Sequence, residues 1–291
     1  MDVVLVSCLE MPEQDVDQAV LLDGLRARGL STDVWAWDDP SRNWAEPRLA
    51  VIRSTWNYHH DLPAFLAWVD RAGAATTVLN SPALVRANAH KQYLRTLAGA
   101  HVPVVPTMWF AREETPPLRK LLAHQGWDRV VVKPAVSAGS WMTALFEADM
   151  HAGAELRAHE LLRSRDVMVQ PYVASVEEYG ERSLVWINGS LSHAVRKARR
   201  LEADTESVSR TAVDIADDER ALALMALETS LEQHGRGLCV QDLLYARIDI
   251  ARDESGVPML MELELIEPSL FLLQAPMALD ALVSAIQSHA Q

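Results

Sequence analysis

Two alternating segments near the end of the chain, residues 246–250 and 260–265, constrain the fold most strongly. Apolar and polar residues alternate along both segments, which is typical of β-strands with one apolar face. The sequence between them, DESGVP at residues 253–258, has the composition of a tight turn. We therefore predict a β-hairpin whose turn is centred between Ser255 and Gly256.

This hairpin would gather three acidic side chains on one face. Asp249 would lie opposite Glu262, and Arg247 would lie opposite Glu264. Because facing acids destabilise a sheet, a positive group should compensate them, and hard carboxylate oxygens suit Mg²⁺. The alternative is the solvated side of an amphipathic strand. The apolar run that follows, residues 268–273, favours partial burial, where acids need partners.

Composition and charge narrow the class of protein. The 291 residues carry a net charge of −13 with a pI near 5.2, whereas a nucleic-acid-binding protein needs a basic surface. A nucleotide ligand stays compatible, because it needs only a few local cations. Two cysteines make no disulfide framework, no apolar run reaches the length of a membrane span, and the first residues lack the basic region of a secretion signal. We expect a cytoplasmic enzyme without nucleic-acid or membrane partners.

The first part of the chain has the pattern of a doubly wound parallel sheet. Strands and helices are predicted in alternation at residues 3–6, 15–28, 32–37, 49–53, 62–72 and 77–79. Ligands of such sheets bind beyond the carboxyl ends of the strands, where Arg53, Ser54 and Thr55 make a candidate substrate site. The alternative is a loop in which Arg53 merely pairs with an acid. No glycine-rich dinucleotide fingerprint follows the first strand, so a nicotinamide or flavin enzyme is not expected.

Two lysines and a small loop follow. Lys91 lies in a predicted helix over residues 83–97, and Lys133 ends an apolar strand, VVVKP, where a lysine is costly unless it has an anionic partner. The small residues 135–140 then lead into a predicted return strand at 141–146. A loop of this kind can cradle phosphate oxygens with its backbone N–H groups. The alternative is an ordinary exposed hairpin.

A second predicted hairpin carries a basic cluster. It follows an apolar strand at residues 167–173, and Asn188-Gly189 is a strong two-residue turn signal. Its return strand, residues 191–195, runs into the sequence RKARR at 196–200. Arg196 and Lys197 would complement a phosphate or a carboxylate, whereas the alternative is a solvated face.

Taken in order, these motifs resemble the ATP-grasp superfamily, on the side of glutathione synthetase and ribosomal-protein-glutamate ligase. The resemblance runs from about residue 80 to the end. The phrases RSTW and ELELIEPSLF are similar to those of the ATP-grasp cyclo-ligases that close O-ureido-D-serine to D-cycloserine. The implied fold is a Rossmann-like pre-grasp domain at residues 1–85, followed by two α+β subdomains, 86–173 and 174–291, that clamp ATP.

The resemblance also implies a role for individual residues. The phosphates of ATP would contact Lys91, Lys133, Ser137, Ala138, Gly139 and Ser140. Adenine and ribose would be bound by Gln170, Tyr172, Val173 and either Glu177 or Glu178. The catalytic cations would be Arg182, Arg196 and Lys197, and the Mg²⁺ ligands Asp249, Glu262 and Glu264. The substrate would meet Arg53, Ser54, Thr55, Arg210 and Ser269.

The implied reaction is ATP-dependent ligation of a small-molecule carboxylate to a nitrogen through an acyl phosphate, with cyclisation of O-ureido-D-serine as the favoured case. The alternatives are a ligase that joins an amino acid or small amine to a carboxylate, and a non-catalytic nucleotide-binding protein. Many relatives have Glu-x-Asn where this chain has Glu262-Leu263-Glu264, and the acidic loop at 201–216 leaves the substrate open. Glu267, outside the alternation, is expected to be structural or substrate-facing. A homo-oligomer is compatible with such a family.

Overall fold

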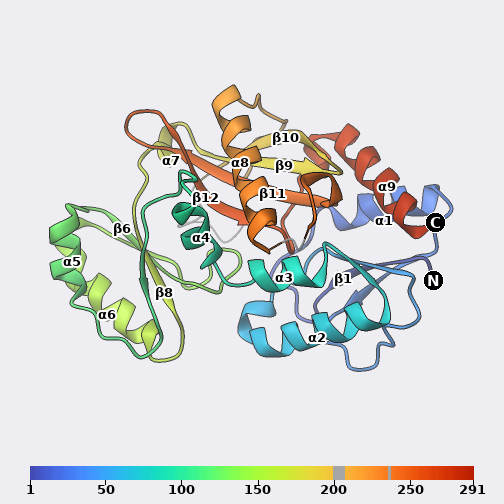
Figure 1. The fold of residues 1–291 in the computed structure, drawn as a ribbon, viewed down its shortest axis with the longest axis horizontal. Helices are drawn as coiled ribbons and strands as arrows, with labels where there is room; N and C mark the ends of the chain where they lie inside the picture. Colours follow the sequence, from blue (N-terminus) through green and yellow to red (C-terminus); the bar gives the residue numbers. More distant parts are fainter. Residues whose placement is uncertain (199–206, 235–236) are drawn as a thin grey trace.

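The structure is a computed structural model that describes residues 1–198, 207–234 and 237–291. In these ranges the strands form three four-stranded sheets, and helices pack on each of them to give three lobes (Figure 1). This arrangement confirms the predicted α/β class. None of the helices in the described ranges is long and apolar enough to cross a membrane.

The N-terminal lobe contains a parallel sheet. Its strands are β1 (Val3–Ser7), β2 (Thr32–Ala36), β3 (Leu49–Ile52) and β4 (Thr77–Leu79), and its two longest helices are α1 (Gln18–Ala27) and α2 (Leu62–Ala75). The strand order is β2-β1-β3-β4, and all pairs are parallel, as predicted. Val3 and Leu5 share one core with Leu21 of α1, whereas Val4 shares another with Phe65 of α2. Because both faces are covered, β1 and β3 are buried along their length.

The central lobe contains an antiparallel sheet in the order β5-β8-β6-β7. Its elements are β5 (Met108–Phe110), α5 (Leu118–Gln125), β6 (Val130–Pro134), β7 (Ala144–Phe146), α6 (His151–Leu162) and β8 (Val167–Pro171). Helices α5 and α6 share a core with β6 and β8. The return strand begins at Ala144 rather than at 141, because Ser140 and Met142 have positive φ angles of 62° and 57° that are incompatible with a strand.

The C-terminal lobe contains a second antiparallel sheet in the order β10-β9-β11-β12. Its elements are α7 (Ser175–Glu178), β9 (Glu181–Ile187), β10 (Ser190–Lys197), α8 (Asp217–His234), β11 (Tyr245–Arg252) and β12 (Pro258–Glu264). Asn188 and Gly189 form the predicted two-residue turn, both with positive φ. The last helix, α9 (Pro276–Ala290), returns to α1, so the two termini lie on the same side of the molecule (Figure 1). The domain boundaries predicted from the sequence stay a prediction.

Short 3₁₀ helices complete the described elements: η1 (Tyr58–His60), η2 (Ala148–Met150), η3 (Val240–Asp242) and η4 (Leu272–Gln274). The single helix predicted over 83–97 is wrong. The chain instead forms α3 (Pro82–Asn88) and α4 (Tyr93–Gly99), and Lys91 lies in the break between them. Its backbone N–H donates to the Ala135 carbonyl oxygen at 2.9 Å, outside any helical ladder. This bond ties the break to the small loop of the central lobe.

The C-terminal hairpin has the predicted register around its acids. Arg247 pairs with Glu264 and Asp249 pairs with Glu262, and the register then shifts at a β-bulge after Asp249. The Asp253 N–H donates to the Val257 carbonyl oxygen at 2.9 Å, so the turn is centred on Ser255 and not after it. The bulge absorbs this difference of half a residue. The turn centre was predicted half a residue too late, and the bulge was not predicted. These two errors cancel at the acids, so their predicted pairing is confirmed.

Candidate active site

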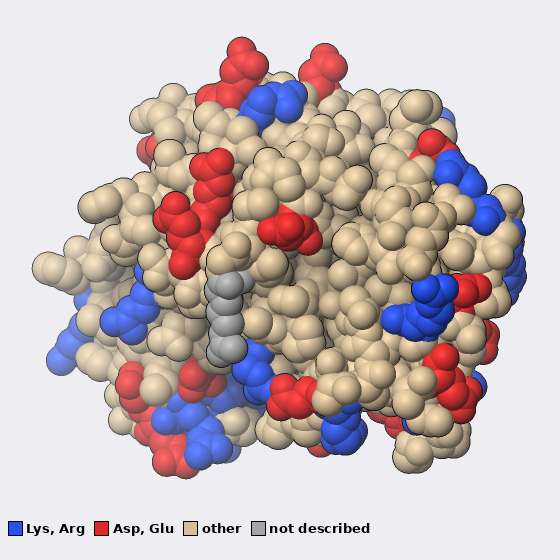
Figure 2. Space-filling model, turned by 45° about the vertical axis from the view of Figure 1, so that its right-hand side comes forward, with Lys and Arg blue, Asp and Glu red and all other residues tan. Residues whose placement is uncertain are grey.

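A cavity of about 910 Å³ lies where the three lobes meet. Its walls include residues 56–60 of the N-terminal lobe, 137–141 and 170–173 of the central lobe, and 261–264 of β12. Seven acids and four lysine or arginine side chains line it: Glu10, Glu13, Glu181, Asp249, Glu262, Glu264, Glu267, Lys91, Lys133, Lys197 and Arg247. On the outer face drawn in Figure 2, acidic and basic side chains are instead interspersed among neutral ones. The cavity is therefore the strongest candidate site for ligand binding.

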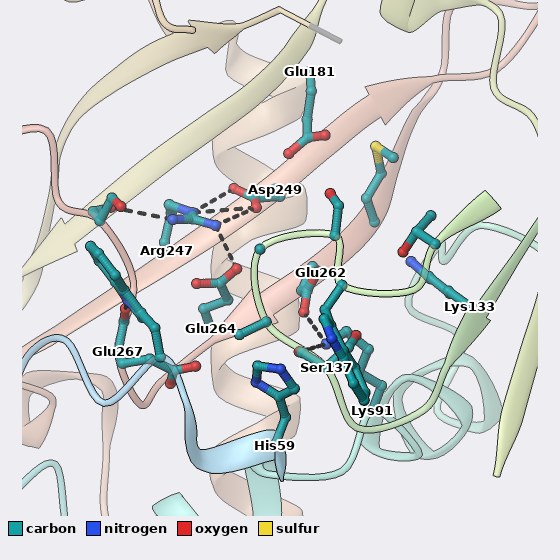
Figure 3. A pocket seen from close by; sticks show the side chains of 18 of the residues that line it. His59, Lys91, Lys133, Ser137, Glu181, Arg247, Asp249, Glu262, Glu264 and Glu267 are labelled. Atoms are coloured by element: carbon teal, nitrogen blue, oxygen red, sulfur yellow. Dashed lines mark hydrogen bonds and ion pairs between the residues drawn. The ribbon is translucent and has the colours of Figure 1, made fainter. Parts of the chain in front are cut away.

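Lys91 joins β12 to the small loop of the central lobe. Its Nζ lies 2.8 Å from Glu262 Oε1 and donates to the Ser137 carbonyl oxygen at 2.7 Å (Figure 3). Burial disfavours the charged forms of both side chains, but their mutual attraction outweighs it: the pKa of Lys91 is raised and that of Glu262 lowered. Both groups are therefore ionised at neutral pH. The ion pair holds the loop over the cavity.

Asp249 is the most heavily bonded of the acids. Ser183 Oγ donates to Asp249 Oδ1 at 2.6 Å, Lys197 Nζ donates to Oδ2 at 2.9 Å, and Arg247 Nε donates to Oδ1 at 3.0 Å. Burial raises the pKa of Asp249, but Arg247 and Lys197 together hold it well below its usual range. Arg247 also pairs with Glu264. Arg247 thus compensates two acids, where the sequence had suggested only one.

For Glu264 and Glu181, the effect of burial on the pKa outweighs the opposite effect of the basic partner. Burial raises the pKa of Glu264 to about 7, despite the charge of Arg247. Glu181 pairs with Lys197, and burial again raises its pKa. Removing either basic partner would leave a buried acid without compensation.

The predicted magnesium ligands fit a divalent cation by donor type. Glu262 and Glu264 come from one face of β12, and only one oxygen of each is bonded to a described residue. Both oxygens of Asp249 have protein partners. In the described ranges, no three acidic, histidine or cysteine side chains by themselves form a metal cage. Mg²⁺ is commonly held by one or two carboxylates together with nucleotide phosphates and water, and Glu262 and Glu264 suit that arrangement.

One end of the cavity contains most of the predicted nucleotide residues. Lys91, Lys133, the loop residues Ser137, Ala138, Gly139 and Ser140, and the strand-end residues Gln170, Tyr172 and Val173 all line it. Gln170 donates to Thr107 Oγ1 at 2.9 Å, and the Arg129 guanidinium lies 4.1 Å from the centre of the Tyr172 ring. The Lys133 amine makes no hydrogen bond or ion pair with any described residue, and burial lowers its pKa. Such a cation suits an anionic ligand.

The predicted ribose acids lie outside this wall. Glu177 pairs with Arg129 at 3.1 Å, and Glu178 is exposed on α7. The acid that lines the cavity near them is Glu181, on the first residue of β9. The short helix α7 turns Glu177 and Glu178 toward the surface before the strand begins. Glu181 is thus the acid of this segment that lines the cavity, whereas the ribose-binding role of Glu177 or Glu178 stays a prediction.

Of the three predicted catalytic cations, only Lys197 lines the cavity. Arg182 lies against the Tyr179 ring at 4.4 Å, and Arg196 donates to the Tyr179 and Glu178 carbonyl oxygens at 2.9 and 2.6 Å. The reason is strand alternation, because neighbouring residues face opposite sides of a sheet. Neither Arg182 nor Arg196 lines the cavity, and the catalytic role predicted for them stays a prediction. Arg196 instead packs over Gly180, where a Cβ atom would meet its side chain at 2.5 Å.

The predicted substrate residues divide in the same way. Arg53, Ser54 and Thr55 are buried and do not line the cavity, and Arg53 donates to the Pro268 carbonyl oxygen at 2.8 Å. Arg210 is exposed and away from the cavity wall, whereas Ser269 lines it. The predicted bases at 199 and 200 and the loop residues 201–206 lie outside the described residues.

Two aromatic contacts at the cavity wall were missed by sequence reasoning. The Trp141 ring lies 4.6 Å from the His59 ring and 5.1 Å from the His60 ring. Burial lowers the pKa of His59 to about 4, so this contact is neutral at physiological pH. These residues follow no strand or helix periodicity, and nothing in the sequence indicated that they meet.

The fold and the cavity together define the ATP-grasp class of ligases. The ATP-grasp ligase PsnB, solved with a phosphomimetic variant of its minimal precursor, Mg and ADP, has the same fold, with a TM-score of 0.65 at 17% identity over 100% of this chain and 99% of that one. Two relatives of more than 30% identity, described next, show that this chain is an ATP-dependent ligase.

Those relatives identify the family. The crystal structure of D-cycloserine synthetase DcsG matches with a TM-score of 0.90 at 31% identity, covering 99% of each chain. The cycloserine biosynthesis protein DcsG of Streptomyces lavendulae is 34% identical over 265 residues, 88% of either chain. Residues 3–80 match the protein family defined by the N-terminal domain of D-cycloserine synthetase DcsG. The chain belongs to the DcsG family of ATP-grasp ligases.

Proposed function

We propose that this ligase uses ATP and Mg²⁺ to activate the carboxylate of O-ureido-D-serine and closes the molecule to D-cycloserine. The observation that carries the proposal is the 34% identity, over 88% of both chains, to a protein named for cycloserine biosynthesis. The cavity supports it, because Lys91 and Lys133 offer cations for phosphates and Glu262 and Glu264 offer carboxylates for Mg²⁺.

The nucleotide would occupy the end of the cavity that contains Lys133. Its base would lie against the strand end at Gln170, Tyr172 and Val173, and its phosphates would meet Lys91 and Lys133. The N–H groups of Ala138, Gly139 and Ser140 offer further donors to phosphate oxygens. When bound at Glu262 and Glu264, Mg²⁺ would neutralise the charge that develops on the phosphates.

The chain's own residues would supply positioning and positive charge. A carboxylate oxygen of the substrate attacks the γ-phosphorus, and the bond to ADP breaks, which gives an acyl phosphate. Lys197 and Arg247 are held among acids beside this position, so their charges are fixed before the reaction begins. The substrate nitrogen then attacks the acyl carbon, and phosphate leaves. Because the ring nitrogen of D-cycloserine carries no carbamoyl group, one water must also cleave the bond between that nitrogen and the carbamoyl carbon, which releases CO2 and NH3.

The contact between Trp141 and the two histidines at the cavity wall favours a small substrate over a peptide. Trp141 of the loop lies against His59 and His60, so the small-residue loop and the N-terminal lobe meet above the cavity. Exclusion of water would protect the acyl phosphate from hydrolysis. A second function, ligation of two separate molecules, would need this contact to open for the acyl acceptor.

The test is ADP release by the purified chain with ATP, Mg²⁺ and a panel of amino acids, with product masses recorded. O-Ureido-D-serine is expected to give D-cycloserine and one ADP per ring. Glu262→Gln should raise the Mg²⁺ concentration needed for half-maximal rate by about tenfold, whereas Glu254→Gln, in the exposed hairpin turn, should not change it. ADP release only with two separate substrates would favour the intermolecular ligase. No ADP with any carboxylate would favour a binding protein.

A further inference from the structure

One acid in the cavity has a different environment from the others. Glu267 is 8% exposed and points into the same space as His59 (Figure 3). Its carboxylate makes no hydrogen bond or ion pair with any described residue. Glu181, Asp249, Glu262 and Glu264 each pair with a lysine or arginine. An unpaired buried carboxylate is costly, so its retention calls for a ligand.

The backbone around Glu267 is held by an unusual set of bonds. Three successive carbonyl oxygens, at 266, 267 and 268, each accept a hydrogen bond from a side chain. The donors are Tyr245 Oη at 2.7 Å, Trp56 Nε1 at 2.9 Å and Arg53 Nη2 at 2.8 Å. Arg53 and Trp56 come from the N-terminal lobe, so this segment is fixed from two sides. The Glu267 side chain is thereby aimed into the cavity, as a preorganised binding group requires.

The groups nearest the carboxylate leave room for a cation. Arg247 and Lys91 influence Glu267 through their charges, but both already bind other acids. His59 is neutral because of its burial. Ser269, which lines the same wall, offers a neutral hydroxyl. The complement of this end of the cavity is a small group with one positive charge and several N–H donors.

We propose that Glu267 binds the α-ammonium group of an amino-acid substrate and so selects amino acids over simple carboxylic acids. This inference rests on the proposed function, since it concerns the substrate of the same cavity. An ammonium group carries one charge and three donors, which a single carboxylate can satisfy. Held there, the ammonium would orient the substrate so that its carboxylate faces the cations beside Glu262 and Glu264. Glu267 is therefore a specificity-determining residue.

The test compares two substrates on two enzymes. The substrates are O-ureido-D-serine and 3-(ureidooxy)propanoic acid, which lacks only the α-amino group. On the wild-type protein, the loss of that group should lower kcat/KM for ADP release by about a hundredfold. Glu267→Gln should lower kcat/KM for O-ureido-D-serine by a similar factor, mainly through KM. The same substitution should change the rate with the analogue, and the KM for ATP, by less than about threefold.

Glu254→Gln is the matched control and should leave both substrates unaffected, because that acid is exposed in the hairpin turn. The proposal is overturned if Glu267→Gln slows both substrates equally, or if it raises the Mg²⁺ requirement as Glu262→Gln does. It is also overturned if the wild-type protein uses the analogue as well as the amino acid. That arm needs no variant, so a Glu267→Gln protein that fails to fold does not leave the proposal untested.

Failure of the proposed function is distinguishable from failure of this inference. If O-ureido-D-serine gives ADP but no ring, or no ADP at all, the proposed function fails. The two enzymes are then compared with whichever carboxylate does release ADP. The inference stands if that substrate carries an α-ammonium group and loses at least about thirtyfold on Glu267→Gln, and it falls if either condition is not met.

Discussion

Lys133 and Glu267 lie on opposite sides of the view into the cavity in Figure 3, and the charged group of neither has a protein partner in the described ranges. By contrast, Lys91, Lys197 and Arg247 are paired with Glu181, Asp249, Glu262 and Glu264. Burial lowers the pKa of Lys133 and raises the pKa of Glu267 to about 8, so the protein disfavours the charged form of each side chain when no ligand is bound. The difference in sign separates an end suited to phosphates from an end suited to an ammonium group.

The largest effect is expected from removing the unpaired cation. Lys133→Met should slow ADP formation by roughly a thousandfold, since a fixed positive charge would be missing beside the transferring phosphoryl group. The free energy of unfolding should not fall, because the substitution removes a partly buried charge that has no partner in the described ranges. Steady-state ADP assays and urea unfolding measure the two quantities. Lys120→Met, on the exposed side of α5, is the control. A large loss of stability with unchanged activity would contradict this assignment.

The paired cations should behave differently from Lys133. Lys197→Met should slow ADP formation by about a hundredfold and also destabilise the fold, because Glu181 and Asp249 would lose a partner inside the cavity. Its neighbour provides a matched control: Arg196→Met removes a cation from the opposite face of β10 and should change the rate by less than about threefold. Equal effects on the rate would show that strand alternation does not decide which cation acts.

The two ends also differ in how far the sequence could predict them. Lys133 was indicated by the cost of a lysine at the end of an apolar strand. Glu262 lies in an alternating strand, so periodicity indicated the face that its side chain shares with Glu264. The pairing of Asp249 with Glu262 followed from the same pattern. The same alternation places Lys197 and Arg196 on opposite faces of β10, and Glu181 and Arg182 on opposite faces of β9. The predicted set of catalytic cations did not apply this rule to Arg182 and Arg196.

The substrate end follows no such periodicity. Glu267 lies in an irregular segment whose conformation depends on Arg53 and Trp56, more than two hundred residues away in the sequence. Trp141 meets His59 only because two lobes close on each other. Pattern reasoning reports on local geometry, and these contacts are long-range. Arg53 was therefore predicted to touch the substrate, whereas it holds the backbone of the residue that we propose does so.

The unpaired acid should appear in the pH dependence of stability. The folded-state pKa of Glu267, about 8, is above its ordinary value of 4.5. The folded state therefore holds a proton that the unfolded state has lost, and stability falls as pH rises between these values. Between pH 6 and 8, wild-type protein should lose about 2 kcal/mol more than Glu267→Gln, which has no proton to release. Urea unfolding at both pH values measures the difference. If the free energy of unfolding of the two proteins changed equally with pH, Glu267 would not hold this extra proton in the folded state.

The smallest effect is expected from removing the contact between Trp141 and His59. Trp141→Ala would remove the ring that lies against His59 and admit water to the acyl phosphate. ADP release should continue, but the ratio of ADP to ring product should rise about fivefold, since hydrolysis would compete with closure. Trp141→Phe keeps an aromatic ring at the contact and should keep the ratio near that of the wild-type protein. An unchanged ratio in Trp141→Ala would mean that this contact does not exclude water. The separation of the two ends would then rest on Lys133 and Glu267 alone.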